Sequence, residues 1–135
     1  MPPEPHVYPL RIRLHDTDAA GVLFYGHLFR HAHDAYETFM EGLGFPLHDL
    51  LDRGVRLPIT RAEAHYARAL RLGDRVRVEL HVTEVRRRSF ALDYRFLDEQ
   101  GQICAQARTV HCLADADGAG LPAPLHLALT ERVTT

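Results

Sequence analysis

The longest regular pattern in the chain runs from about Phe24 to Leu43, where apolar residues recur every three or four positions. Its members are Leu28, Ala32, Ala35, Phe39 and Leu43. This spacing places them on one face of an α-helix and predicts a helix that buries that face. Its end is marked by residues that stop helices, namely Gly42, Gly44 and Pro46.

Alternation of apolar and polar residues, typical of half-buried strands, fills most of the remaining chain. The strands that it predicts span 7–14, 55–68, 76–82, 90–96 and 103–113. A turn-rich stretch at 98–102 predicts a hairpin between the last two. The segment 46–54 fits a short second helix, and 16–21 is expected to be a loop.

The order of these elements predicts an α+β fold. Four consecutive strands follow the helices and are expected to form an antiparallel meander. The long helix must bury its apolar face, so the simplest arrangement is an antiparallel sheet of about five strands wrapped around one central helix. A second copy of the chain would cover the sheet edge that remains. With 135 residues the chain suits one domain, with its core at about 7–115 and a partly irregular tail at 116–135.

Charge and composition argue against several classes of protein. A net charge of −2 disfavours a general nucleic-acid binder, because no broad positive field is expected. No apolar run approaches the ~20 residues of a membrane span, and residues 1–10 lack the pattern of a signal peptide. Cys104 and Cys112 are too far apart to pair if they share a strand, so free thiols in a cytoplasmic protein are expected.

Several stretches together resemble the hotdog-fold acyl-CoA thioesterases of the 4-hydroxybenzoyl-CoA thioesterase family. They are DTDAAGVLFYGHLFR at 16–30, HDAYETFMEGLGF at 33–45, LPITRAEAHYARALRLGD at 57–74, RRRSFALDYRF at 86–96 and ARTVHCLAD at 107–115. The second and third look closest to the 1,4-dihydroxy-2-naphthoyl-CoA thioesterases of quinone biosynthesis. The resemblance implies a hotdog fold, hydrolysis of an acyl-CoA, a homodimer or homotetramer, and neither a metal nor a cofactor.

The loop before the long helix carries two acids, Asp16 and Asp18. From the residues alone, either could close an Asx turn or cap the helix. The resemblance implies that Asp18 is the catalytic carboxylate, acting as nucleophile toward the thioester carbonyl or as general base for water. Asp16 would point the other way in an extended loop and is expected to be structural.

The start of the helix suggests which group stabilises the oxyanion during attack on the thioester. Gly21 allows a tight turn, and the first N–H groups of a helix lack acceptors and carry partial positive charge. The resemblance implies that the backbone N–H of Tyr25, aided by Gly26, holds the oxyanion. A helix start with a buried aromatic residue is the alternative interpretation.

His27, His31 and Asp34 recur at a helical spacing that suits a metal. The family uses none, so a polar stripe at a pocket or a subunit contact is the expected interpretation. His27 lies close to the proposed catalytic acid in the sequence, where the family often has an amide. It is a candidate to line the acyl pocket or contact the thioester.

A basic run, formed by Arg86, Arg87, Arg88 and Ser89, lies between two predicted strands. Arginine forks suit the phosphates of coenzyme A, and the family has basic residues here that contact the nucleotide. Protection of an edge strand by charge explains the run equally well. Thr60 would point toward the acyl site if the strand register holds.

Motifs for other chemistries do not occur: there is no G-x-S-x-G, G-x-G-x-x-G or G-x-x-x-x-G-K-[ST]. The sequence therefore predicts a thioesterase for an aromatic acyl-CoA, in first place 1,4-dihydroxy-2-naphthoyl-CoA. The alternatives are a short- or medium-chain or 4-hydroxybenzoyl-type acyl-CoA thioesterase, and a non-catalytic hotdog domain that binds acyl-CoA. Asp18 counts against the last, because a pure binder would not need an anion beside the thioester.

Overall fold

A computed structural model of the chain describes residues 3–114 and 118–134. Its elements are β1 (His6–Arg11), a 3₁₀ turn (Leu14–Asp16), α1 (His27–Leu43), α2 (Leu47–Asp52), β2 (Ile59–Tyr66), β3 (Arg75–Val85), β4 (Ser89–Leu97), β5 (Ile103–Cys112) and α3 (Ala123–Thr130). The predicted strands and the two predicted helices are confirmed, with shifted ends. The long helix begins at His27 rather than near Phe24, and β2 begins at Ile59 rather than Val55.

The sheet contains five antiparallel strands in the order β1-β3-β4-β5-β2. The predicted meander is wrong for β2, which pairs with β5 and not with β3. The connection 67–74 explains the difference, because its backbone forms hydrogen bonds with Cys104 in β5 and with Ile12 just after β1. It thus crosses the end of the sheet and leaves β1 and β2 as the two edges.

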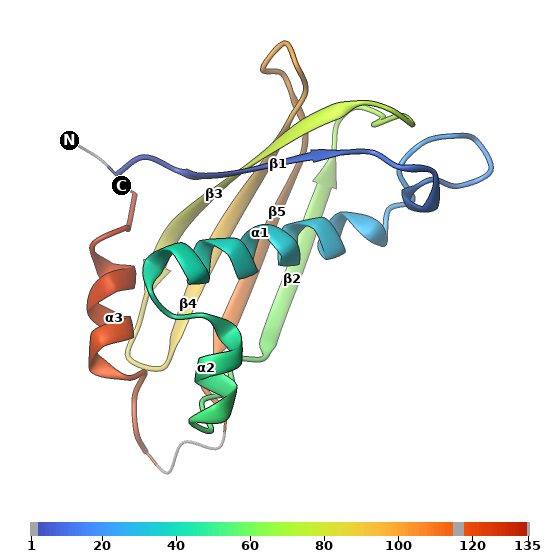
Figure 1. Cartoon of the computed structure of the whole chain (residues 1–135). Coiled ribbons are helices and arrows are strands. Elements are labelled where there is room, and N and C mark those ends of the chain that lie inside the picture. The colour runs from blue at the N-terminus through green and yellow to red at the C-terminus, as the bar shows by residue number, and fades with distance from the viewer. Residues whose placement is uncertain (1–2, 115–117, 135) are drawn as a thin grey trace.

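The core lies between α1 and one face of the sheet (Figure 1). The predicted apolar stripe is buried on that side, except that Leu43 is only partly buried. The sheet contributes alternate side chains from its three central strands, namely Val76, Val78, Leu80, Val82, Phe90, Leu92, Tyr94, Phe96, Ala105 and Ala107. This sheet around one long helix confirms the predicted α+β hotdog fold.

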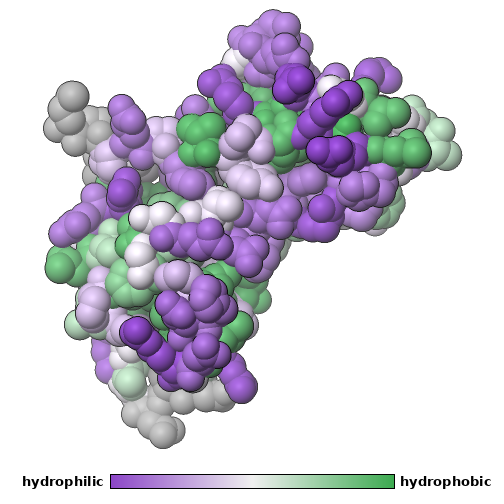
Figure 2. Space-filling model, in the orientation of Figure 1, coloured by the Kyte–Doolittle hydropathy of each residue, from purple (hydrophilic) through white to green (hydrophobic). Residues whose placement is uncertain are grey.

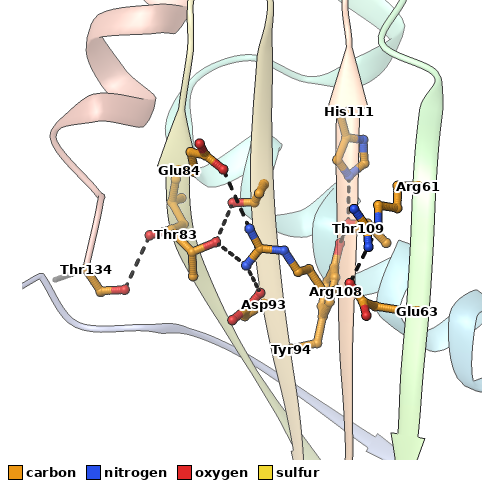
Figure 3. Close-up of polar contacts among 12 residues, drawn as sticks. Arg61, Glu63, Thr83, Glu84, Asp93, Tyr94, Arg108, Thr109, His111 and Thr134 are labelled. Atoms are coloured by element: carbon orange, nitrogen blue, oxygen red, sulfur yellow. Dashed lines mark hydrogen bonds and ion pairs between the residues drawn. The ribbon is translucent and has the colours of Figure 1, made fainter.

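One row of polar side chains lies inside this core (Figure 3). The hydroxyls of Tyr94 and Thr109 are 2.9 Å apart, and the Thr109 hydroxyl is 2.9 Å from Nε2 of His111. The ring of His111 stacks on Phe90 with centroids 4.9 Å apart. Burial lowers the pKa of His111 to about 4, so this side chain is neutral near pH 7.

The C-terminal segment is more regular than predicted. It forms α3, which packs beside β3 (Figure 1) and buries Leu125 and Leu129 completely. Val133 then forms a parallel bridge with Val82. Residues 116, 117 and 135 of the predicted tail lie outside the described residues. No helix in the described ranges is both long and apolar enough to span a membrane.

Two leucines of α3 test whether this helix belongs to the core. Leu129 is 0% exposed and Leu127 is 60% exposed. We expect Leu129→Ala to lower the free energy of unfolding by about 3 kcal/mol, because it leaves a cavity. Leu127→Ala should change it by less than about 0.5 kcal/mol. Urea unfolding of both variants measures the difference, and equal effects would contradict the packing of α3.

Candidate active site

The loop before α1 folds into a small hairpin. The N–H of Phe24 donates to the carbonyl of Asp16 at 2.9 Å, and the N–H of Asp18 donates to the carbonyl of Val22 at 2.9 Å. Gly21 closes the hairpin with a φ of 76°, a conformation that other residues rarely adopt. The hairpin thus holds Asp18 and the start of α1 in one compact segment.

Asp18 is exposed on this hairpin. Its Oδ1 accepts the N–H of Ala20 at 2.8 Å and that of Val22 at 3.4 Å, which is the Asx turn considered from the sequence. Among the described residues, its Oδ2 has no hydrogen-bond partner. The turn fixes the carboxylate and leaves one oxygen available for chemistry.

Asp16 is fully buried and acts as the anchor of the loop. Its Oδ2 accepts the N–H of Arg13 at 2.8 Å, and its Oδ1 contacts the Arg30 guanidinium and Nε2 of His31 at 3.0 Å. Burial alone would raise the pKa of Asp16, but the Arg13 N–H and the neighbouring His31 and Arg30 outweigh it and lower that pKa overall. These contacts agree with the structural role expected for Asp16.

The predicted stripe of His27, His31 and Asp34 does not act as a unit. His31 turns to Asp16, and burial lowers its pKa despite that carboxylate. The ring of His27 packs edge-on against Phe24 with centroids 5.5 Å apart. Within residues 3–114 and 118–134, no cluster of three or more His, Cys, Asp or Glu side chains is arranged to hold a metal.

The helix start presents two backbone donors. Among the described residues, the N–H groups of Tyr25 and Gly26 have no acceptor, and Gly26 is the N-cap of α1. The carbonyl of Tyr25 accepts the Tyr66 hydroxyl at 2.6 Å. The Tyr25 side chain is 68% exposed, so this aromatic residue is not buried in the chain.

Tyr66 was not singled out from the sequence, although it ends the strand β2. It also lines a cavity of about 290 Å³ beside the hairpin. The other lining residues are mostly apolar, namely Val22, Leu23, Ala67, Arg68, Ala69, Leu70 and Ala105. Val22 and Leu23 of the hairpin line this cavity, whereas Asp18, Tyr25 and Gly26 do not, and its lining suits an apolar ligand.

Exposed hydrophobic side chains gather at this end of the molecule. Leu14, Phe24, Tyr25 and Leu72 each expose two fifths or more of their surface. Figure 2 shows hydrophobic surface at the end where Figure 1 places the hairpin. Such surface is typical of a binding site or a subunit contact.

A second set of the predicted residues lies on the outer face of the sheet. Thr60, Arg86 and Ser89 line a groove of about 540 Å³, together with Arg61 and Arg108. Thr60 sits at a bulge of β2, where its hydroxyl donates to the carbonyl of Val110 at 3.4 Å.

The three arginines of the basic run have different partners. Arg86 pairs with Glu84 at 2.6 Å and stays 72% exposed. The Arg88 guanidinium donates to the carbonyl of Leu113 at 3.2 Å, and that of Arg87 donates to the carbonyl of Gly118. Arg87 and Arg88 do not line the groove.

Arg108 is held in the groove by acidic neighbours (Figure 3). Its guanidinium lies 3.0 Å from Asp93, 3.2 Å from the Thr83 hydroxyl and 3.7 Å from Glu84. This pairing neutralises most of its charge. Arg61 has a looser partner, Glu63 at 3.8 Å. By exposure, Arg61 at 73% and Arg86 at 72% are the accessible guanidinium groups of the groove, although Arg86 is also paired with Glu84.

The candidate residues at the hairpin and those at the outer-face groove lie at opposite ends of β2. Thr60 begins that strand, and Tyr66, which contacts Tyr25, ends it. At ~3.3 Å per residue these ends are about 20 Å apart. One chain therefore brings Asp18, Tyr25, Gly26 and His27 together, but it does not bring Thr60 or Arg86 to them.

Comparisons with known proteins agree with this fold. A family model described as the thioesterase-like superfamily matches residues 12–133. A 1,4-dihydroxy-2-naphthoyl-CoA hydrolase of Synechococcus elongatus is 42% identical over 119 residues, covering 86% of this chain and 87% of the relative. A solved 1,4-dihydroxy-2-naphthoyl-CoA thioesterase from Synechocystis has a TM-score of 0.85 at 28% identity, covering 93% and 95% of the two chains. A gentisyl-coenzyme A thioesterase has a TM-score of 0.84 at 28% identity, covering 92% and 98%.

The chain therefore belongs to the thioesterase-like superfamily. It is a thioester hydrolase with the hotdog fold. The family resemblance drawn from the sequence is confirmed.

The two acids of the hairpin are expected to respond differently to the same substitution. Asp16→Asn should lower the free energy of unfolding by about 3 kcal/mol, because it removes the buried carboxylate that pairs with Arg30 and contacts His31 and the Arg13 N–H. Asp18→Asn should change it by less than about 0.5 kcal/mol, since the amide oxygen can still accept the N–H of Ala20. Denaturant unfolding near pH 7 compares them, and an equal loss in both would refute the anchoring role of Asp16.

Proposed function

We propose that this protein hydrolyses 1,4-dihydroxy-2-naphthoyl-CoA to the free acid and coenzyme A, a step of quinone biosynthesis. The observation that carries the proposal is the pairing, in one hairpin, of an oriented carboxylate at Asp18 with unaccepted N–H groups at Tyr25 and Gly26 among the described residues. The 42% identity with a 1,4-dihydroxy-2-naphthoyl-CoA hydrolase supports this choice of acyl group. The largely apolar cavity beside Tyr66 suits an aromatic acid.

The proposed chemistry has two routes. In the first, an oxygen of Asp18 bonds to the thioester carbon, the C–S bond breaks, the thiolate takes a proton and leaves, and water hydrolyses the resulting anhydride. In the second, Asp18 takes a proton from a water molecule as the water oxygen bonds to the thioester carbon, the C–S bond breaks, and the leaving thiolate receives that proton. Both develop negative charge on the carbonyl oxygen, which the N–H of Tyr25 would stabilise by about 3 kcal/mol.

The proposal assigns the coenzyme A phosphates to the basic run. Arg86, Arg87, Arg88 and Ser89 remain its candidates, and the outer-face groove favours Arg86 and Ser89. Guanidinium groups bind phosphates through paired donors. Thr60 and His27 are the remaining candidates for substrate contact, at the groove and at the helix start.

We further propose that the site is completed in a homodimer through the edge strand β2. This strand has no partner on its outer side among the described strands, and Ala62, Ala64 and Tyr66 on its helix-facing side are exposed or half-exposed. A twofold axis at this edge would pair two β2 strands antiparallel. The Tyr66 end of one chain would then lie near the Thr60 end of its partner, which would join the hairpin of one chain to the groove of the other.

A panel of coenzyme A thioesters tests the activity. We expect fastest release of coenzyme A from 1,4-dihydroxy-2-naphthoyl-CoA, slower release from gentisyl-CoA and 4-hydroxybenzoyl-CoA, and little from aliphatic chains. Asp18→Asn should lower kcat by about a thousandfold or more while the protein stays folded. Binding without release from any substrate would favour the non-catalytic alternative, and an active Asp18→Asn variant would remove the mechanism.

Mixed dimers test whether the sites are shared. Asp18→Asn and Arg86→Ala chains are each expected to be slow at low substrate concentration. In a shared-site dimer, one of the two sites of the hybrid receives an intact Asp18 and an intact Arg86 from different chains. Unfolding and refolding the two variants together should therefore restore activity above the sum of the separate samples. Activity that stays at that sum would contradict the shared site.

A further inference from the structure

The C-terminal segment touches the turn that carries the basic run. The N–H of Leu121 donates to the carbonyl of Arg87 at 2.8 Å, and the Arg87 guanidinium donates to the carbonyl of Gly118. Gly120 allows this approach, because a Cβ there would lie 2.8 Å from the Arg87 carbonyl oxygen and 3.0 Å from its Cγ. We call these contacts, made by Arg87, Gly118, Gly120 and Leu121, the clasp.

Both sides of the turn are fixed. Leu121 is buried, and the helix that follows it is held by the buried Leu125 and Leu129. On the other side, the N–H of Leu113 donates to the carbonyl of Arg88 at 2.8 Å. The turn 86–89 is therefore gripped between β5 and the C-terminal segment, and the N–H of Arg86 closes it on the carbonyl of Ser89 at 2.8 Å.

We propose that the clasp positions Arg86 and Ser89 for the anionic phosphates of the thioester's carrier, and that Arg87 is a positioning residue rather than a phosphate ligand. This inference rests on the proposed function. Arg86 and Ser89 line the outer-face groove, whereas Arg87 points to Gly118 and does not line it. A turn fixed before binding loses less entropy when it takes up the ligand, so the clasp favours affinity for the phosphates.

The test compares two thioesters of the same acid, one of coenzyme A and one of N-acetylcysteamine, which lacks all phosphates. Gly120→Ala inserts a methyl group into the clasp and should raise KM for the coenzyme A thioester about tenfold, the value of one charge-assisted hydrogen bond. KM for the N-acetylcysteamine thioester should not change. Gly42→Ala, at a helix position where a Cβ meets nothing within 4 Å, is the matched control and should change neither value.

A second variant distinguishes loss of the clasp from a folding defect caused by the added methyl group. Arg87→Ala removes the donor to Gly118 without adding atoms and should produce the same selective rise in KM. In an Arg86→Ala background, neither variant should raise KM further, because both act through Arg86. Full additivity of Arg87→Ala with Arg86→Ala would instead identify Arg87 as a direct phosphate ligand and overturn the proposal.

The remaining outcomes separate this inference from the proposed function. If Gly120→Ala and Arg87→Ala hydrolyse both thioesters with an unchanged KM, the proposed role of the clasp is overturned while the proposed function stands. An equal rise in KM for both thioesters would also overturn that role, since that result reports a general disturbance. If the unmodified protein hydrolyses neither thioester, the proposed function fails and the clasp's role fails with it.

Discussion

The buried carboxylate of Asp16 fixes the part of the molecule where chemistry is expected. A buried charge is stable only when it is compensated, and here the Arg30 guanidinium, the backbone N–H of Arg13 and Nε2 of His31 contact it. Because these partners come from the loop and from α1, their common acceptor ties the hairpin to the helix. The Asx turn of Asp18 and the open N–H groups of Tyr25 and Gly26 lie in the segment that this attachment holds.

The sequence predicted most elements because periodicity is a local property. Alternation located β3 and β4 closely, and the stripe from Leu28 to Leu43 located α1. The place of β2 was not predictable in this way, since a strand's partner depends on the path of the connection that precedes or follows it. The helix α3 was missed because its eight residues are apolar almost all round, so no periodic stripe marks it.

Only those parts of the candidate site that form a continuous motif in the sequence could be predicted. Asp18, Tyr25 and Gly26 stand together in the sequence and stay together in the fold, and their catalytic roles remain a proposal. The contact from Tyr66 to Tyr25 joins residues 41 positions apart and has no local signature. The same holds for Arg87 and Gly118, 31 positions apart, so the different surroundings of the three arginines emerge only in three dimensions.

The crossing connection 67–74 also sets an order of events as the chain collapses. The strands β3, β4 and β5 follow one another through short turns, so their pairing closes small loops. Docking of β2 must bring Thr60 next to Cys112, 52 positions away, and therefore closes a much longer loop. Pairing of β1 with β3 closes a longer loop still, so both edge strands are expected to dock after β3, β4 and β5 have paired. Any assembly that uses the open side of β2 has to wait until that strand has docked.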